Sequence, residues 1–283
     1  MTETSPNTLA FIGPGTMAEA MIAGLLRQGV ATPEQIVAAG PRRPRLEELA
    51  HRYNIRTSTD NAEAARSADV VVLSIKPQVL KKVLPELHGQ LRAEALVLSI
   101  VAGAPIERLS AGLAHQAVVR AMPNTPAQIG QGISVWTASA AVSAAQRARA
   151  EQILAALGET VFMEDEVYLN MATALSGTGP AYVFLFMEAL VDAGVHLGFP
   201  RRVAEHLVVQ TVKGSAAYYE MHRGDVHLAH LRNQVTSPGG TSAAALYYLE
   251  KAGFRTAISR AVWAAYERAL ALAQGGKPQP PQG

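Results

Sequence analysis

Hydroxyl groups and glycines are concentrated in the stretch Leu231–Glu250, LRNQVTSPGGTSAAALYYLE. Its centre, Ser237 to Ser242, combines three hydroxyl side chains with the sequence Pro-Gly-Gly. Proline is favoured in the first turn of a helix and serine just before it, so we expect a helix to begin here with Ser237 as its N-cap. The free N–H groups of a first turn bind small anions, and two glycines allow another molecule to approach closely. The stretch therefore predicts a seat for a carboxylate, although an ordinary capped helix would have the same residues.

A second pattern with the chemistry of an anion site lies near the amino end. Gly13-Pro14-Gly15-Thr16-Met17-Ala18 has the G-x-G-x-x-A spacing of dinucleotide-binding turns. It follows a predicted strand, Leu9–Ile12, and opens a helix with one apolar face that stops at Gly29. A second strand, Gln35–Ala39, comes next. This order of strand, glycine turn, helix and strand predicts a nucleotide that lies with its pyrophosphate on the helix N-terminus.

The residues after the second strand distinguish the two nicotinamide cofactors. Sites for NAD usually carry a carboxylate there, which binds the ribose 2′-hydroxyl. This chain has Gly40-Pro41-Arg42-Arg43-Pro44-Arg45 and no carboxylate before Glu47. Arginines at that place suit a 2′-phosphate, so we expect Arg42 and Arg43 to bind NADPH, with NADH as the weaker cofactor. The alternative is a solvated basic loop without a ligand.

The elements that must position these groups follow a parallel pattern and then a helical one. Buried-type strands are predicted at Asp69–Ile75, Leu96–Ile100 and Val118–Met122, and further strands at Ile133–Thr137 and Val161–Met163, with a helix at Ala144–Leu157 between them. After Glu164 only helical periodicity remains. We therefore expect an α/β Rossmann-like domain at residues 1–164, an all-α dimerisation domain at 165–275 and a disordered tail at 276–283.

Composition narrows the class of protein. The chain has 283 residues, a net charge of +2, no block of like charge and no cysteine, which excludes disulfides and thiolate metal sites and offers no surface for nucleic acid. The first residues resemble no signal peptide, and the longest apolar run, Ala181–Met187, ends at Glu188 and is too short to span a bilayer. We expect a cytoplasmic protein. Its helices are apolar enough to leave exposed faces on a monomer, which predicts an obligate dimer.

Five segments together resemble the pyrroline-5-carboxylate reductase family over Leu9–Gln274. They are FIGPGTMAEAM at Phe11–Met21, SIKPQ at Ser74–Gln78, RAMPNTPAQIGQG at Arg120–Gly132, LSGTGPAYVF at Leu175–Phe184, and the stretch Leu231–Glu250. The order Val-Thr-Ser-Pro-Gly-Gly in the last segment is the most specific of these features. The resemblance implies reduction of the ring C=N of 1-pyrroline-5-carboxylate to L-proline by NADPH. It also implies a homodimer that interlocks through the helical domain, with a decamer as a further assembly of such dimers.

The resemblance also assigns roles to residues. The pyrophosphate turn would comprise Gly13, Gly15, Thr16 and Met17, and the rest of the cofactor would be lined by Asn61, Lys76, Pro77, Ala102, Asn124 and Thr125. The substrate carboxylate would lie on Ser237, Gly239, Gly240 and Thr241, while the hydroxyl of Ser242 would face the ring nitrogen. Asp225 would belong to the substrate site of the other subunit. Ser242, Asn233 and Asp225 depart from the family's usual threonine, aspartate and glutamate, which bears on rate or pH profile rather than on the reaction.

The chemistry of the stretch agrees with this assignment. An imine whose nitrogen is already protonated accepts a hydride without a strong acid, and no Lys, His or carboxylate stands between Gln234 and Leu249. A hydroxyacid dehydrogenase of similar architecture would need a lysine on the first long helix, and Ser176–Glu188 has none. A non-catalytic NADP-binding protein is the other alternative. His222, His227 and His230 lack the carboxylates that would complete a metal site, so no metal is predicted.

Overall fold

The computed structural model describes residues 8–274, which form two compact units. The first unit extends to Thr178 and takes in the described residues from Ala264 onward, and the second spans Gly179–Trp263. The change from strands to helices after Glu164 therefore precedes the change of unit, because the first helices after the sheet still pack on it. The predicted tail, 276–283, lies outside the described residues.

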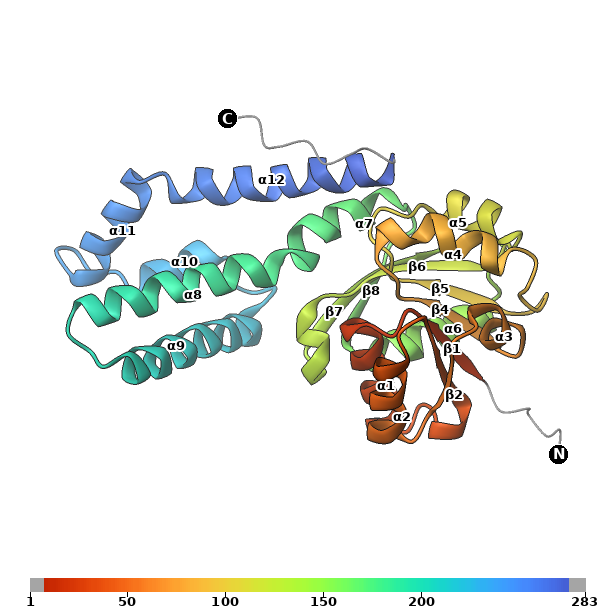
Figure 1. The fold of residues 1–283 in the computed structure, drawn as a ribbon. Coiled ribbons are helices and arrows are strands. Elements are labelled where there is room, and N and C mark those ends of the chain that lie inside the picture. Colours follow the sequence, from red (N-terminus) through yellow and green to blue (C-terminus); the bar gives the residue numbers. More distant parts are fainter. Residues whose placement is uncertain (1–7, 275–283) are drawn as a thin grey trace. The chain divides into compact units, whose positions relative to one another are not determined.

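An eight-stranded sheet forms the centre of the first unit in the described part of the chain (Figure 1). Its order is β3-β2-β1-β4-β5-β6-β7-β8, and neighbours are parallel except for the antiparallel pair β6 and β7. The strands are β1 (Leu9–Ile12), β2 (Ile36–Ala39), β3 (Arg56–Ser58), β4 (Val70–Leu73), β5 (Leu96–Ser99), β6 (Val118–Met122), β7 (Gly132–Ala138) and β8 (Gly158–Phe162). Consequently the carboxyl ends of the parallel strands β1 to β6 lie along one edge of the sheet, and a ligand of such a sheet binds there. Those that matter for the site are the ends of β1, β2, β4, β5 and β6.

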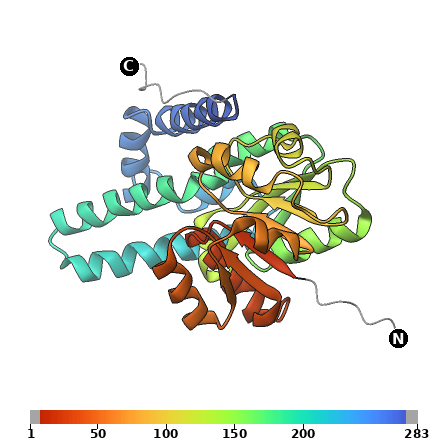
Figure 2. The ribbon, with the colours of Figure 1, turned by 45° about the vertical axis from the view of Figure 1, so that its right-hand side comes forward.

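Helices cover both faces of this sheet because its strand residues alternate between two apolar clusters (Figure 2). Leu9 and Phe11 of β1 pack with α1 (Thr16–Arg27), α2 (Arg43–Tyr53) and α6 (Ala144–Ala155). Ala10 and Ile12 pack on the other face with α3 (Asn61–Arg66), α4 (Leu80–Leu87) and α5 (Ile106–Leu113). Four short strands are buried on both sides, which explains why their sequences are continuous apolar runs. The short 3-10 turns are η1 (Pro33–Gln35), η2 (Pro77–Val79) and η3 (Thr125–Ile129).

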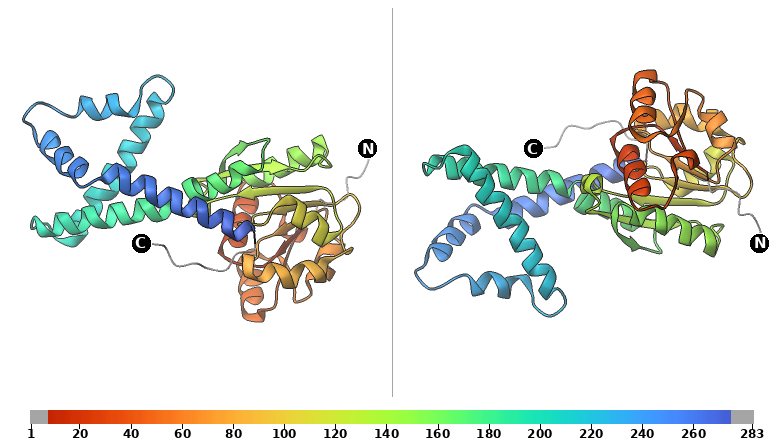
Figure 3. Two further views of the ribbon diagram at one scale, coloured as in Figure 1. Left: turned by 90° about the horizontal axis from the view of Figure 1, so that it is seen from above. Right: turned by 90° about the horizontal axis from the view of Figure 1, so that it is seen from below.

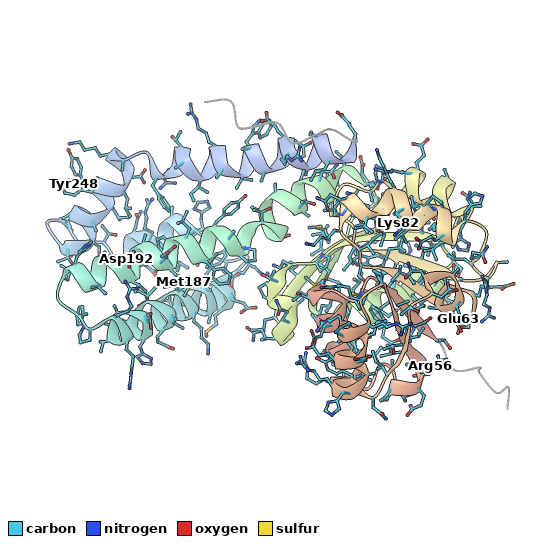
Figure 4. The ribbon with its side chains drawn as sticks, in the orientation of Figure 1. Arg56, Glu63, Lys82, Met187, Asp192 and Tyr248 are labelled. Carbon is cyan, nitrogen blue, oxygen red and sulfur yellow. The ribbon has the colours of Figure 1, made fainter. Side chains whose placement is uncertain are left out.

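The strands predicted from the sequence are confirmed, with their ends shifted by at most three residues, and one strand was missed. That strand is β3 at the sheet edge, whose Arg56 is exposed (Figure 4). A three-residue polar segment carries no apolar alternation, so only pairing with β2 defines it as a strand.

Between Glu164 and Gln274 the secondary structure is helical, as expected. They are α7 (Val167–Ala172), a π-helical turn η4 (Thr173–Gly177), α8 (Gly179–His196), α9 (Arg201–His222), α10 (Leu228–Gln234), α11 (Thr241–Lys251) and α12 (Phe254–Ala273) (Figure 3). In the second unit α8 contacts α9 closely, since a methyl group added at Gly194 would lie 3.1 Å from Cβ of Ala204. The last turn of α12 packs in the first unit, where Leu272 lies against Gly103.

The helical part exposes large apolar side chains in the single chain. Phe184 is 63% exposed, Leu185 67% and Tyr248, labelled on α11 in Figure 4, 69%. By length and composition alone, the helical run Val167–His196 is sufficient to cross a membrane, and an 18-residue window within it has a mean hydropathy of 1.3. The sequence expectation counted only the run that ends at Glu188, whereas the helix continues through that residue. One such helix is weak support for a membrane span, and exposed apolar faces of this extent equally suit contact between subunits.

Candidate functional site

The glycine turn between β1 and α1 has the backbone that an anion site requires. Gly13 has φ +95°, and a Cβ there would lie 2.5 Å from Cγ2 of Ile75, so both conformation and space demand glycine. Gly15 is the N-cap of α1, with no side-chain cap and no atom within 4 Å of an added Cβ among the described residues. Thr16 and Met17 follow as the first helical residues. The N-terminus of α1 is therefore open to a phosphate group.

The three arginines after β2 separate into two kinds. Arg42 is the N-cap of α2 and Arg43 its first residue; both are exposed, and neither forms an ion pair within residues 8–274. Arg45 is instead half-buried, and its guanidinium bonds to Glu19, to Glu48 and to the carbonyl of Pro14. Two cations thus stay available to a ligand beyond β2, while the third is occupied by the protein.

Glu19, in the first turn of α1, is the acidic group next to this turn. Burial by itself would raise the pKa of Glu19, but hydrogen bonds from Arg45 and Tyr53 and the charges of Arg45 and Arg52 bring it below the ordinary value. Tyr53 Oη donates to Glu19 over 2.9 Å, and Arg52 Nη1 lies 2.5 Å from the same carboxylate. Its charge is therefore present at neutral pH and compensated by cations.

Asn61, the first residue of α3, supplies a test of whether a dinucleotide fits. Its Nδ2 donates to Glu86 over 2.9 Å, but its Oδ1 is buried and has no partner in the described part of the chain. A buried acceptor without a donor is costly, and a ligand hydroxyl would satisfy it. The open N-terminus of α1, the exposed Arg42 and Arg43 and the Asn61 amide oxygen together fit a dinucleotide. The first two features suit its phosphates, and the amide oxygen suits a ribose hydroxyl.

The remaining predicted cofactor residues lie at the ends of the central strands. Lys76 and Pro77 follow β4, and Lys76 is exposed at the start of η2. Ala102 follows β5, and Asn124 and Thr125 follow β6. Asn124 Oδ1 accepts a hydrogen bond of 3.0 Å from the backbone N–H of Ile133, which fixes the loop between β6 and β7. These ends meet at one edge because the five strands are parallel.

Sequence reasoning missed two residues that position this edge. The Ser74 hydroxyl lies 3.1 Å from the carbonyl of Ile12 and 3.0 Å from that of Gly13, so it ties the end of β4 to the glycine turn. Arg45 was included only as part of a basic loop. Serine after a strand carries no signal by itself, but Arg45 stands three residues before Glu48 on a helix, a spacing that favours an ion pair over a free cation.

The Pro-Gly-Gly segment differs from its predicted form. The helix α11 begins at Thr241 with Gly240 as N-cap, so Ser237 is not the N-cap and Pro238 is not in the first helical turn. Ser237 to Gly240 instead form a turn, closed by a 3.0 Å bond from Gly240 N–H to the Ser237 carbonyl. Gly239 has φ +70°. A regular helix that began at Pro238 would require a negative φ at this residue, so the turn excludes the predicted helix start.

This turn still produces an uncapped helix N-terminus. A Cβ at Gly240 would lie 2.5 Å from Ser237 Oγ, so only glycine lets that hydroxyl fold over the turn. Thr241 and Ser242 are the first two residues of α11, and Ser242 is half-buried. Among the described residues no side chain caps this end of α11. The segment thus offers N–H groups and hydroxyls within one turn, as an anion seat requires.

Asp225 and the histidines precede this segment in the sequence of the second unit. Asp225 is exposed in the connection between α9 and α10, and its backbone N–H bonds to the His222 carbonyl over 3.1 Å. His227 caps α10 through Nδ1, which accepts from Ala229 N–H at 3.1 Å. Within residues 8–274 no group of three or more His, Asp or Glu side chains could hold a metal ion. The predicted residues Ser237–Ser242 are consecutive in the chain and end in the first turn of α11, whereas Asp225 lies in the separate connection between α9 and α10.

Comparison with known proteins extends over both units. Residues 166–272 match the family model described as pyrroline-5-carboxylate reductase dimerisation, and residues 8–103 match NADP oxidoreductase coenzyme F420-dependent. The chain is 43% identical over 264 residues to pyrroline-5-carboxylate reductase of Synechocystis, covering 93% of this chain and 97% of that protein. It is 44% identical over 267 residues to the enzyme of that name from Pseudomonas aeruginosa, covering 94% and 97%.

Solved structures give the same result. The pyrroline carboxylate reductase of Plasmodium falciparum with NADP bound matches with a TM-score of 0.86 at 32% identity, over 95% of this chain and all (100%) of that one. A pyrroline-5-carboxylate reductase from Coxiella burnetii matches with a TM-score of 0.84 at 35% identity, over 97% of this chain and 100% of that one.

Proposed function

Because this chain belongs to the pyrroline-5-carboxylate reductase family, a family of NAD(P)-dependent oxidoreductases, we propose that it reduces 1-pyrroline-5-carboxylate to L-proline with NADPH. The observation that carries the proposal is the turn Ser237–Gly240 before α11. It presents an uncapped helix N-terminus with hydroxyl groups and no acid, which suits a carboxylate beside a protonated imine.

The proposed cofactor site uses the edge of the sheet. Gly13, Gly15, Thr16 and Met17 would hold the pyrophosphate on α1, and the Asn61 amide oxygen would accept from a ribose hydroxyl. Lys76, Pro77, Ala102, Asn124 and Thr125 would line the rest. When bound, NADPH supplies the hydride. We prefer NADPH to NADH because Arg42 and Arg43 are exposed without a protein carboxylate to neutralise them among residues 8–274.

The proposed substrate site orients the ring. Ser237, Gly239, Gly240 and Thr241 would bind the carboxylate by backbone N–H and hydroxyl groups, which fixes the orientation of the ring and of its C=N bond on the second unit. The Ser242 hydroxyl would hydrogen-bond to the ring nitrogen while that atom changes from planar to pyramidal. No group of the chain needs to donate a proton at that moment, since a protonated imine brings its own. Asp225 would complete the site across the dimer interface.

The assembly and location are part of the proposal. We propose a homodimer through the helices after Glu164, with a decamer as the larger form. Large apolar side chains of these helices are exposed in the single chain, and residues 166–272 match the family model for dimerisation. We place it in the cytoplasm, without a nucleic-acid or membrane partner. Sedimentation at micromolar concentration should give a dimer or a multiple of it. A compact, active species of one chain's mass would contradict the dimer.

One assay separates this function from its alternatives. NADPH oxidation should occur with pyrroline-5-carboxylate, and reduction of NADP⁺ with 2-hydroxy acids should not. The absence of lysine from Ser176–Glu188 favours the first outcome over a hydroxyacid dehydrogenase. Turnover of 2-hydroxy acids instead would establish the dehydrogenase, and NADPH binding without turnover of either class would establish a non-catalytic protein.

A further inference from the structure

Arg45 makes three contacts, which connect α2 to the glycine turn and to the first turn of α1. Its Nε donates to the carbonyl of Pro14 over 3.0 Å, Nη1 donates to Glu48 over 2.7 Å, and Nη2 pairs with Glu19. Pro14 is the central residue of Gly13-Pro14-Gly15, and Glu19 lies in the first turn of α1. The side chain is only 17% exposed. A single guanidinium on α2 therefore binds both the turn and the helix that follows it.

The contact with Pro14 fixes one peptide plane at both of its ends. Arg45 holds the carbonyl of Pro14, while the N–H of Gly15 in the same peptide bonds to the Gly13 carbonyl over 2.8 Å. A peptide unit is planar, so these two bonds determine its orientation. Gly15 is the N-cap of α1, and this plane therefore sets the direction in which the first N–H groups of α1 face.

The turn is also held sterically from the same side. Pro14 is buried, and a Cβ at Gly40 would lie 2.6 Å from its Cδ. The end of β2, the start of α2 and the glycine turn are thus in direct contact.

The pair with Glu19 has an electrostatic consequence. A carboxylate in the first turn of α1 stabilises the helix but repels a diphosphate at the same end. Arg45 and Arg52 both bind this carboxylate, so their charges compensate it close to the N-terminus of α1.

We propose that Arg45 is a positioning residue for the dinucleotide pyrophosphate, and that it does not read the 2′-phosphate. This rests on the proposed cofactor site. It divides the basic loop into two tasks: Arg42 and Arg43 distinguish the cofactors, and Arg45 acts on what the cofactors share. NADPH and NADH have the same pyrophosphate, so loss of Arg45 must weaken both alike.

The test is direct binding of NADPH and NADH, measured by calorimetry or by quenching of protein fluorescence, without turnover. Arg45→Gln should raise the Kd of both nucleotides by about tenfold, the order of one hydrogen bond to a charged group. Arg45→Lys keeps the charge but has a single nitrogen for three partners, and should raise both by a smaller, equal factor. Arg52→Gln is the matched comparison: it removes a cation from Glu19 without touching Pro14, so it should raise both Kd values by a clearly smaller factor than Arg45→Gln does.

The outcomes are distinct. A rise for NADPH alone would overturn the proposal and make Arg45 a reader of the 2′-phosphate. Unchanged Kd values in folded Arg45→Lys, with only the melting temperature lowered, would overturn it in favour of a purely structural role. An equal effect of Arg52→Gln would overturn the importance of the Pro14 contact. Failure of the unaltered protein to bind either nucleotide would contradict the proposed function itself.

Discussion

Arg120 on β6 and Glu166, just before α7, form an ion pair whose arginine is almost completely enclosed. Nη1 of Arg120 lies 2.7 Å from Oε1 of Glu166, with side-chain exposures of 3% and 30%. Nη2 donates to Asn170 over 3.0 Å, and the same carboxylate oxygen accepts from Ile106 N–H at 2.9 Å. This network joins α7 and the start of α5 to the strand that leads into the Asn124 loop.

Removal of the Glu166 carboxylate should lower the free energy of unfolding more than is usual for a partly exposed residue. Glu166→Ala leaves a buried guanidinium without its counter-charge, and we expect the free energy of unfolding to fall by about 2–3 kcal/mol, below the usual range for fully buried pairs because water reaches Glu166. Denaturation by urea measures it. Glu164→Ala removes an exposed carboxylate two residues away and should cost less than about 0.5 kcal/mol. Equal losses would show that the ion pair does not stabilise the fold.

The free energy of unfolding should depend on pH through the ionisation of Glu19. Its pKa in the folded protein lies below the ordinary 4.5, so it binds protons less readily than in the unfolded chain. Its contribution is therefore fully present above about pH 4.5 and is lost as the pH falls through its lowered pKa. Glu19→Gln should lower the free energy of unfolding by about 1–2 kcal/mol at pH 7, and the difference should shrink on acidification.

Unfolding of the nucleotide-free protein at several pH values tests this. Glu47→Gln on the same helix as Arg45 removes an exposed carboxylate and should leave the pH dependence unchanged. Curves of Glu19→Gln and the unaltered protein that stay parallel from neutral to acid pH would rule out the linkage.

Arg42 and Arg43 should select the cofactor. Replacement of both by alanine should raise the Michaelis constant for NADPH by roughly 10- to 100-fold, the order of one or two charge-assisted hydrogen bonds, and leave that for NADH almost unchanged. Initial rates with each cofactor measure this. An equal loss with both would assign these arginines another task, and would match what we expect of Arg45.

Ser242→Ala should slow the hydride transfer. If the hydroxyl stabilises the changing ring nitrogen, turnover should fall by roughly 10- to 100-fold, or about 1.4 to 2.7 kcal/mol, with normal cofactor binding. Ser242→Thr should stay within a few-fold because the hydroxyl remains. Ser237→Ala should instead raise the Michaelis constant for the imine acid, since that hydroxyl folds over Gly240. Turnover of Ser242→Ala at the full rate would exclude the hydroxyl from the mechanism.

Local patterns in the sequence were sufficient for the elements that carry the site. The run Leu9–Ile12 followed by Gly13-x-Gly15 predicts a buried strand and a turn, because burial on both faces demands continuous apolar residues and φ +95° demands glycine. The edge at which the strands end follows from their parallel order. The Pro-Gly-Gly segment was found for the same reason, although its helix was placed too early. Ser237 and Pro238 have the local preference for a helix start, but Gly239 adopts φ +70° and the turn closes first.

Only the tertiary structure decided which residues of like type share a task. Arg42, Arg43 and Arg45 are equivalent in sequence, yet only Arg45 meets Glu19 and Pro14, which lie 26 and 31 positions away along the chain. The polar segment β3 becomes a strand because it pairs with β2, and burial leaves the Asn61 amide oxygen without a donor among residues 8–274. Such contacts depend on residues far apart in the chain, whose proximity no local spacing records. The sequence therefore predicts that arginines follow β2, but the contacts of α2 with α1 and the glycine turn determine that Arg45 is occupied and that Arg42 and Arg43 remain exposed.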